Sequence, residues 1–162
     1  MSVVDFQKQD NGYLVMLNSA LNSSTFKNNA TYEFDWGLLG APDDEFEMYF
    51  TCYFVRCDTN SASLKIPLIS LGCGGFTTYT SVPNTFASPS NIIGAVSLQT
   101  VSTTGLLRCD EATNPPVYFN QRPTNNIFSV QFLKSDGTGY WNPASSTFPN
   151  YVMTMRFVKL DK

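Results

Sequence analysis

The sequence predicts an all-β protein folded as a single sandwich of two sheets. Apolar and polar residues alternate with a period of two along several segments, which is the pattern of half-buried strands. The chain of 162 residues suits one domain, and its 13 Phe, 8 Tyr and 2 Trp can fill one large core. Several connections between the alternating segments are too long for hairpins, which indicates strands that cross between sheets in a Greek-key arrangement.

Four segments show the clearest alternation and predict the central strands. Each gathers aromatic or other large apolar side chains on one face, and the segments are residues 30–36, 46–57, 127–133 and 151–160. In 46–57 the opposite face carries Tyr49, Thr51, Tyr53 and Val55, which are also apolar or semi-polar, so we expect this strand to be covered on both faces. Asp136 and Gly137 predict a hairpin turn after the third segment.

Weaker alternation predicts four more strands, at residues 13–18, 64–71, 92–99 and 117–120. Pro67 marks an edge or a bulge in the second of them, because proline cannot donate to a strand ladder. The resulting total predicts a single eight-stranded jelly-roll β-sandwich. Leu14, Leu17 and Leu21 also fit one face of a short helix. We expect one domain over residues 11–162 and an N-terminal arm over residues 1–10.

The composition excludes several classes of function. Charged residues make up only 14% of the chain, and there is no histidine, which removes Ser-His-Asp triads, Cys-His pairs and the common zinc sites. The 10 Lys and Arg do not cluster and the net charge is −3, so we expect no direct contact with nucleic acid. No apolar run approaches the roughly 20 residues that span a bilayer. The first ten residues do not resemble a signal peptide.

The four cysteines form no CxxC pair, and they are Cys52, Cys57, Cys73 and Cys109. We expect reduced and mostly buried thiols, as in a protein made in the cytosol. A disulfide between Cys73 and Cys109 is an alternative that spacing alone does not decide. Cys73 lies between glycines and is expected to be exposed.

Two groups of carboxylates are candidate sites. One is the cluster of Asp43, Asp44, Glu45 and Glu47, whose oxygens could hold calcium; its spacing is not that of a calcium loop, and its place before a strand favours a solvated turn. The other is the pair Glu33 and Asp35, which could act as catalytic carboxylates but also fits a solvent-facing strand. The glycines at 72–75 lack the Lys-Ser/Thr of a phosphate loop. We expect no catalytic residue, no metal and no cofactor.

The most informative residues are seven aromatics in or next to predicted loops. They form the candidate interface or ligand surface, and they are Tyr79, Phe86, Tyr118, Phe119, Tyr140, Trp141 and Phe148. Three alternatives stay open for them: lids that fold back over the core, a surface that contacts other subunits, and a platform for a glycan.

The second half of the chain resembles a known family. Asn91-Ile92-Ile93-Gly94 precedes a strand, Asn114-Pro115-Pro116 follows it, and the strand at 127–133, the Asp-Gly turn and the strand at 151–157 form a closing hairpin. These features resemble the small single-jelly-roll capsid proteins of large double-stranded DNA viruses, which include penton and minor capsid proteins. The resemblance covers residues 11–160, and its motifs are general to β-sandwiches.

The resemblance implies a non-enzymatic structural protein of the virion. Its expected partners are other copies of itself, as a pentamer or trimer, together with the major and minor capsid proteins of an icosahedral shell. Synthesis and assembly would take place in the host cytoplasm. A carbohydrate-binding module or a fibre-head receptor-binding domain is the alternative, since sugars stack on aromatic faces such as Tyr140 and Trp141. A hydrolase that uses carboxylates is a third and weaker possibility.

Overall fold

The computed structural model describes residues 4–9, 12–24, 27–54, 57–58, 68–76, 92–101, 104–109, 114–134, 139–140 and 150–161. These residues form an all-β sandwich of two antiparallel sheets, with two short 3-10 helices as connections. The strands are β1 (Val4–Gln9), β2 (Gly12–Asn18), β3 (Asn29–Glu33), β4 (Phe46–Phe54), β5 (Cys57–Asp58), β6 (Leu68–Gly72), β7 (Ile92–Ala95), β8 (Ser97–Val101), β9 (Thr104–Cys109), β10 (Val117–Phe119), β11 (Ile127–Leu133) and β12 (Tyr151–Lys159). The helices are η1 (Ser19–Leu21) and η2 (Trp36–Leu39).

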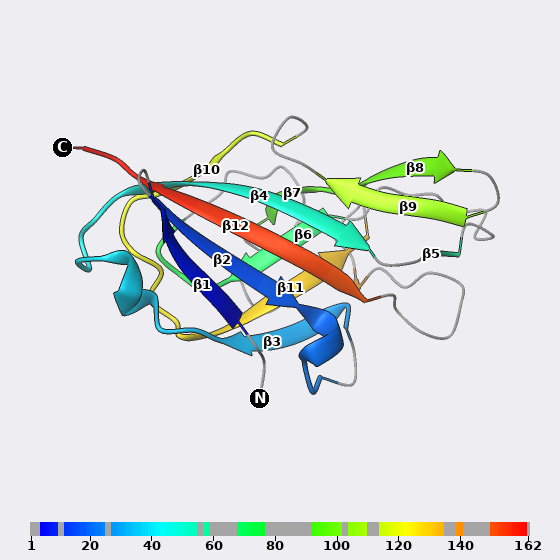
Figure 1. The fold of residues 1–162 in the computed structure, drawn as a ribbon, viewed down its shortest axis with the longest axis horizontal. Helices are drawn as coiled ribbons and strands as arrows, with labels where there is room; N and C mark the ends of the chain where they lie inside the picture. Colours follow the sequence, from blue (N-terminus) through cyan, green and yellow to red (C-terminus); the bar gives the residue numbers. More distant parts are fainter. Residues whose placement is uncertain are drawn as a thin grey trace.

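The strand order is that of a jelly roll. The smaller sheet has the order β3-β11-β6-β7, and the larger sheet contains β2-β12-β4, with β10 paired to the far edge of β4. Along these eight strands, every connection except β6 to β7 passes from one sheet to the other. The prediction of a jelly-roll sandwich is therefore confirmed. The remaining strands, β1, β5, β8 and β9, extend the larger sheet at its two sides (Figure 1).

Several boundaries differ from the prediction for local reasons. β3 ends at Glu33, although the predicted strand extends to residue 36. The reason is that Asp35 caps the start of η2, where its side chain accepts a hydrogen bond of 2.9 Å from the Gly37 amide. The helix alternative for Leu14, Leu17 and Leu21 is wrong, since the first two lie in β2 and only Leu21 lies in η1. Residues 4–9 of the expected arm form β1, which pairs with β2. Pro67, Asp136 and Gly137 lie outside the described residues.

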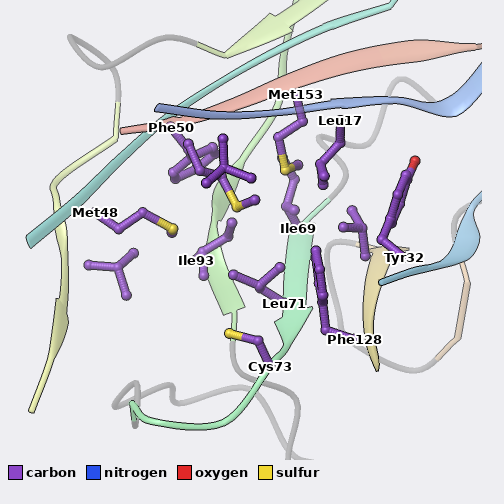
Figure 2. Packing of buried hydrophobic residues seen from close by; sticks show 14 of the residues in the cluster. Leu17, Tyr32, Met48, Phe50, Ile69, Leu71, Cys73, Ile93, Phe128 and Met153 are labelled. Atoms are coloured by element: carbon purple, nitrogen blue, oxygen red, sulfur yellow. The ribbon is translucent and has the colours of Figure 1, made fainter. Parts of the chain in front are cut away.

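Aromatic and methionine side chains fill the space between the sheets. The alternation of β4 and β12 places one face of each strand inward, and Phe50, Met153 and Phe157 are almost fully buried there. Trp36 lies at one end of the core, with ring centroids 4.9 Å from Phe34 and 5.0 Å from Phe128. Figure 2 shows the side chains of the two sheets interdigitating in this layer. The space between the two sheets of the jelly roll is thus filled with packed side chains.

One buried polar cluster joins the two sheets through Tyr32 of β3 and the first residue of β12. The Tyr32 hydroxyl donates to the Tyr151 hydroxyl at 3.0 Å, and the Tyr151 amide donates to the Ser19 hydroxyl at 2.7 Å. Burial raises the pKa of Tyr32 to about 12 and raises the pKa of Tyr151 well above its usual value. Both phenols are therefore held neutral, with their hydrogen bonds replacing those to water.

The raised pKa values of these two tyrosines predict that the protein loses stability at alkaline pH. An unfolded tyrosine loses its proton near pH 10, whereas Tyr32 in the folded protein keeps its proton to about pH 12. The unfolded state therefore binds fewer protons above pH 10, so the free energy of unfolding falls as pH rises from about 10 to 12. Urea titrations over this pH range are expected to show a shallower fall for Tyr32→Phe. Identical pH dependence in the two proteins would contradict the assignment.

Candidate functional site

The outward-facing surface of β4 and its neighbour β12 is the best candidate for a functional surface. We call it the β4 outer face, and it comprises Glu47, Tyr49, Thr51 and Tyr53 of β4 with Val152, Thr154, Arg156 and Val158 of β12. The same alternation that buries the inner side chains of both strands places these residues on the other side of the larger sheet. β4 and β12 pair along their whole lengths, so this surface is continuous.

The two faces of β4 differ sharply in exposure although both carry aromatic residues. Phe50 and Phe54 on the inner face are about 1% exposed, whereas Tyr53 on the outer face is 43% exposed. Tyr49 and Thr51 are half-buried. The expectation that β4 is covered on both faces is therefore wrong for Tyr53 in the single chain. Alternation alone shows that a second face is semi-apolar, but it does not show whether the same chain covers that face.

A network of side chains orders the middle of the β4 outer face. Arg156 of β12 lies directly opposite Tyr49 in the sheet register, and its guanidinium carbon is 4.3 Å from the centroid of the Tyr49 ring. The Tyr49 hydroxyl donates a 2.8 Å hydrogen bond to Glu47, two residues earlier on the same face. This arrangement joins a cation–π contact to a carboxylate hydrogen bond. It holds an arginine and a tyrosine in fixed positions on the surface.

A second pair of contacts lies where β4 begins. The Tyr118 hydroxyl of β10 donates to Glu45 at 2.6 Å, and this hydrogen bond raises the pKa of Tyr118. Lys159, at the end of β12, forms an ion pair with Asp44 at 2.8 Å. Tyr118 pairs with Glu47 in the β10–β4 register, so its exposed ring extends the β4 outer face toward β10.

The seven predicted surface aromatics do not form one surface. Tyr118 is 50% exposed on β10 and Tyr140 is 37% exposed beside Leu133, at the end of β11. Phe119 is fully buried, and its inclusion in a surface is wrong: pairing with Phe46 turns its side chain inward, where its ring centroid is 5.6 Å from that of Phe157. The other four lie outside the described residues, and they are Tyr79, Phe86, Trp141 and Phe148.

Tyr118 and Tyr140 lie toward opposite ends of the sandwich. Next to Tyr118, Phe119 packs on Phe157, near the end of β12. Tyr140 bridges to Leu133, and the preceding Phe132 packs 4.9 Å from Tyr151, at the start of β12. Because β12 is an extended strand of nine residues, the two exposed tyrosines belong to separate surfaces.

The acidic cluster has the contacts of a turn. Asp44 accepts a hydrogen bond of 2.8 Å from the Ala41 amide and also binds Lys159. Glu45 and Glu47 each accept a hydrogen bond from a tyrosine. Among the described residues, no group of three or more Cys, Asp or Glu side chains is arranged to hold a metal ion. Of the other carboxylate pair, Asp35 caps η2 and Glu33 lies on the exposed side of β3.

The glycine-rich segment after β6 encloses Cys73 instead of exposing it. Cys73 is fully buried, so the expectation that it is exposed is wrong. Gly74 and Gly75 adopt φ values of 68° and 88°, which favour glycine and allow a tight turn. The Cys73 carbonyl then accepts hydrogen bonds from the amides of Thr124 and Asn125, which close over it. Burial raises the pKa of the Cys73 thiol, which disfavours the reactive thiolate.

The sequence pattern does not identify three exposed apolar residues as candidates for a functional surface. Ile127, Leu38 and Leu21 are 67%, 52% and 54% exposed. Ile127 and Leu38 lie near one end of the sandwich, because the Phe34 amide and the Trp36 indole bond to residues 126 and 125. Ile127 begins β11, whereas Leu38 and Leu21 lie in the short helices η2 and η1, and at such positions a period of two does not indicate exposure.

Neither sequence comparison assigns the chain to a family. The sequence matches no protein-family model and has no significant match among curated proteins. In the part of the chain that the structure describes, no helix is both long and apolar enough to cross a membrane.

Proposed function

We propose that this protein is a non-enzymatic structural subunit of a viral capsid, which assembles with copies of itself and with other capsid proteins in an icosahedral shell. One observation carries the proposal: β4 has the composition of a strand covered on both faces, yet Tyr53 on its outer face is 43% exposed in the single chain. An aromatic face of this kind is typical of a surface that a neighbouring subunit covers.

The fold supports the same class of function. Jelly rolls are found in viral capsid proteins, lectins and cupins, so the strand order narrows the function to a few classes without choosing among them. Here the space between the sheets is packed with aromatic rings, including Trp36, Phe128 and Phe132. Such a sandwich is a rigid block, and rigid subunits lose little conformational entropy when they pack side by side.

The chemistry of the β4 outer face suits contact with protein. Tyrosine and arginine are enriched at protein interfaces, and this face presents both in fixed geometry through the contact between Arg156 and Tyr49. The carboxylate of Glu47 is already hydrogen-bonded to Tyr49. A neighbouring subunit would therefore meet a face on which the Tyr49 hydroxyl and the Glu47 carboxylate already bond to each other, and burial of its apolar parts would favour association.

The proposal predicts concentration-dependent self-association that a charge on the β4 outer face disrupts. Light scattering of the purified protein is expected to show a closed ring, a pentamer or a trimer. Tyr53→Lys is expected to weaken association at least about tenfold, because an ammonium group would be buried in the contact. Ile127→Lys is the matched control, since Ile127 is also exposed but lies on the smaller sheet.

Three results would contradict parts of the proposal. A chain that is monomeric at every concentration contradicts self-assembly. Equal association of the Tyr53→Lys and Ile127→Lys variants contradicts the choice of face. Absence of the protein from purified virions contradicts the capsid role itself, and specific binding on a glycan array would then favour the carbohydrate-binding alternative.

A further inference from the structure

Two of the four cysteines are direct partners across a pair of strands. In the antiparallel pairing of β4 with β9, Cys52 lies opposite Cys109, and Tyr53 lies opposite Arg108. Directly opposed residues of an antiparallel pair are close cross-strand neighbours in the sheet. Cys52 is on the inner face and is fully buried. The register therefore brings together two cysteines that are far apart in the sequence.

The backbone geometry of such a pair fits a disulfide. Opposed residues in antiparallel strands have Cα atoms about 4.5 or 5.5 Å apart, depending on whether they are a hydrogen-bonded pair. Disulfides join residues whose Cα atoms are about 4.4–6.8 Å apart, so both kinds of pair fall within the range. Both kinds of pair therefore place the two Cα atoms at a separation that a disulfide can span.

Cys73 is not a comparable partner for Cys109. It follows β6 in the smaller sheet, whereas β9 belongs to the larger sheet. Its sulfur donates to the Gly74 carbonyl at 3.5 Å, and Figure 2 shows it at the end of β6 beside Leu71. The sequence left a disulfide between Cys73 and Cys109 open, but the sheet register favours Cys52 over Cys73.

We propose that Cys52 and Cys109 form a cross-strand disulfide when the protein meets a disulfide oxidant such as oxidised glutathione. One cysteine thiolate attacks a sulfur of the oxidant, which releases one glutathione thiolate and leaves a mixed disulfide. The second cysteine thiolate attacks the protein sulfur of that mixed disulfide and releases the second glutathione. The two cysteines lose two electrons and two protons in total, and the oxidant becomes two thiols.

The bond would fasten a weakly attached part of the larger sheet. β9 pairs with β4 at only two described positions, and β8 is attached to the sheet through β9. A Cys52–Cys109 bond would close a loop of about 60 residues, which constrains the unfolded chain. It would also hold β9 in place beside Tyr53 of β4. The inference does not depend on the capsid proposal.

Tryptic peptide mapping tests the pairing without ambiguity. Cleavage after Lys27, Arg56, Lys65, Arg108 and Lys134 places each cysteine on a different peptide. The peptide with Cys109 extends to Lys134 because the bond after Arg122 precedes proline and resists trypsin. The protein is refolded to equilibrium in an oxidised glutathione buffer, alkylated in denaturant and digested. The expected product joins peptides 28–56 and 109–134, with Cys57 and Cys73 alkylated. Four alkylated cysteines, stable glutathione adducts or any other link as the main product would overturn the proposal.

Thermal unfolding gives a second readout that does not depend on peptide recovery. The oxidised protein is expected to unfold about 10 °C above the reduced protein, since loop closure of this size gives a shift of that order. Cys109→Ser is expected to abolish the difference, and Cys52→Ala should do the same. Cys73→Ala is the matched control, a buried cysteine outside the pair, and should retain the difference. A shift that persists in Cys109→Ser would overturn the pairing.

Discussion

Replacing Trp36 by alanine is expected to lower the free energy of unfolding by about 3–5 kcal/mol, as large-to-small changes of buried aromatics do. Trp36 is fully buried, and its indole nitrogen donates to the Asn125 carbonyl at 3.0 Å. Its ring also packs on Phe34, Phe128 and Phe157, so the substitution removes contacts from both sheets. Urea denaturation followed by circular dichroism measures the change.

Two further variants test whether the loss of stability in Trp36→Ala comes from the buried ring and its hydrogen bond. Trp36→Phe keeps an aromatic ring but loses the hydrogen bond to Asn125, so we expect a loss of about 1–3 kcal/mol. Leu38→Ala, on the same 3-10 helix, is expected to change the stability by less than about 0.5 kcal/mol because Leu38 is 52% exposed. If Trp36→Ala and Leu38→Ala were equally mild, η2 would not be part of the core.

Replacing Gly12 by alanine is expected to destabilise the protein by about 3 kcal/mol, because a backbone strain and a steric clash coincide. Gly12 has a φ of 156°, which side-chain-bearing residues rarely adopt. A Cβ atom there would lie 2.1 Å from the Phe157 carbonyl oxygen on β12. Since this neighbour is backbone, β2 and β12 would have to separate. Equilibrium unfolding in urea measures the loss.

Gly139 provides the matched control for Gly12. Among the residues that the structure describes, a Cβ atom at Gly139 would meet only the end of the Lys134 side chain, at 3.8 Å, and that flexible group can move. Gly139→Ala is therefore expected to change the stability by less than about 0.5 kcal/mol. Equal effects at the two positions would show that the contact between β2 and β12 is not as close as the structure places it.

The alternation of apolar and polar residues predicts the strands that bury one face. It does not predict a strand such as β9, which is placed in the sheet by pairing with a neighbouring strand. The predicted segments each overlap a strand of the jelly roll, because inward-facing residues such as Tyr32, Phe50 and Met153 leave a period-two pattern. β9 shows no such alternation in its sequence, and its place beside β4 is set by pairing. Residues 92–99 were expected as one strand, but β7 and β8 join different sheets.

The candidate surface was harder to predict because exposure depends on neighbours in space. Phe119 was grouped with loop aromatics, but its strand pairs with the start of β4 and buries it. Cys73 was expected to be exposed among glycines, but those glycines allow the turn that brings Thr124 and Asn125 over it. Tyr53 was expected to be covered, and only the arrangement of the sheets shows that its face is open.

The place of the last strand has a consequence for how the chain is made. β12 lies between β2 and β4, in the middle of the larger sheet (Figure 1). Until residues 151–159 have left the ribosome, β2 has no partner on its inner side and the two halves of this sheet have no link. The pairings of β12 with β2 and β4 therefore form only after residues 151–159 have been synthesised, between segments far apart in sequence, and such topologies fold slowly. The nascent chain exposes apolar strands during that interval, and exposed apolar strands favour aggregation.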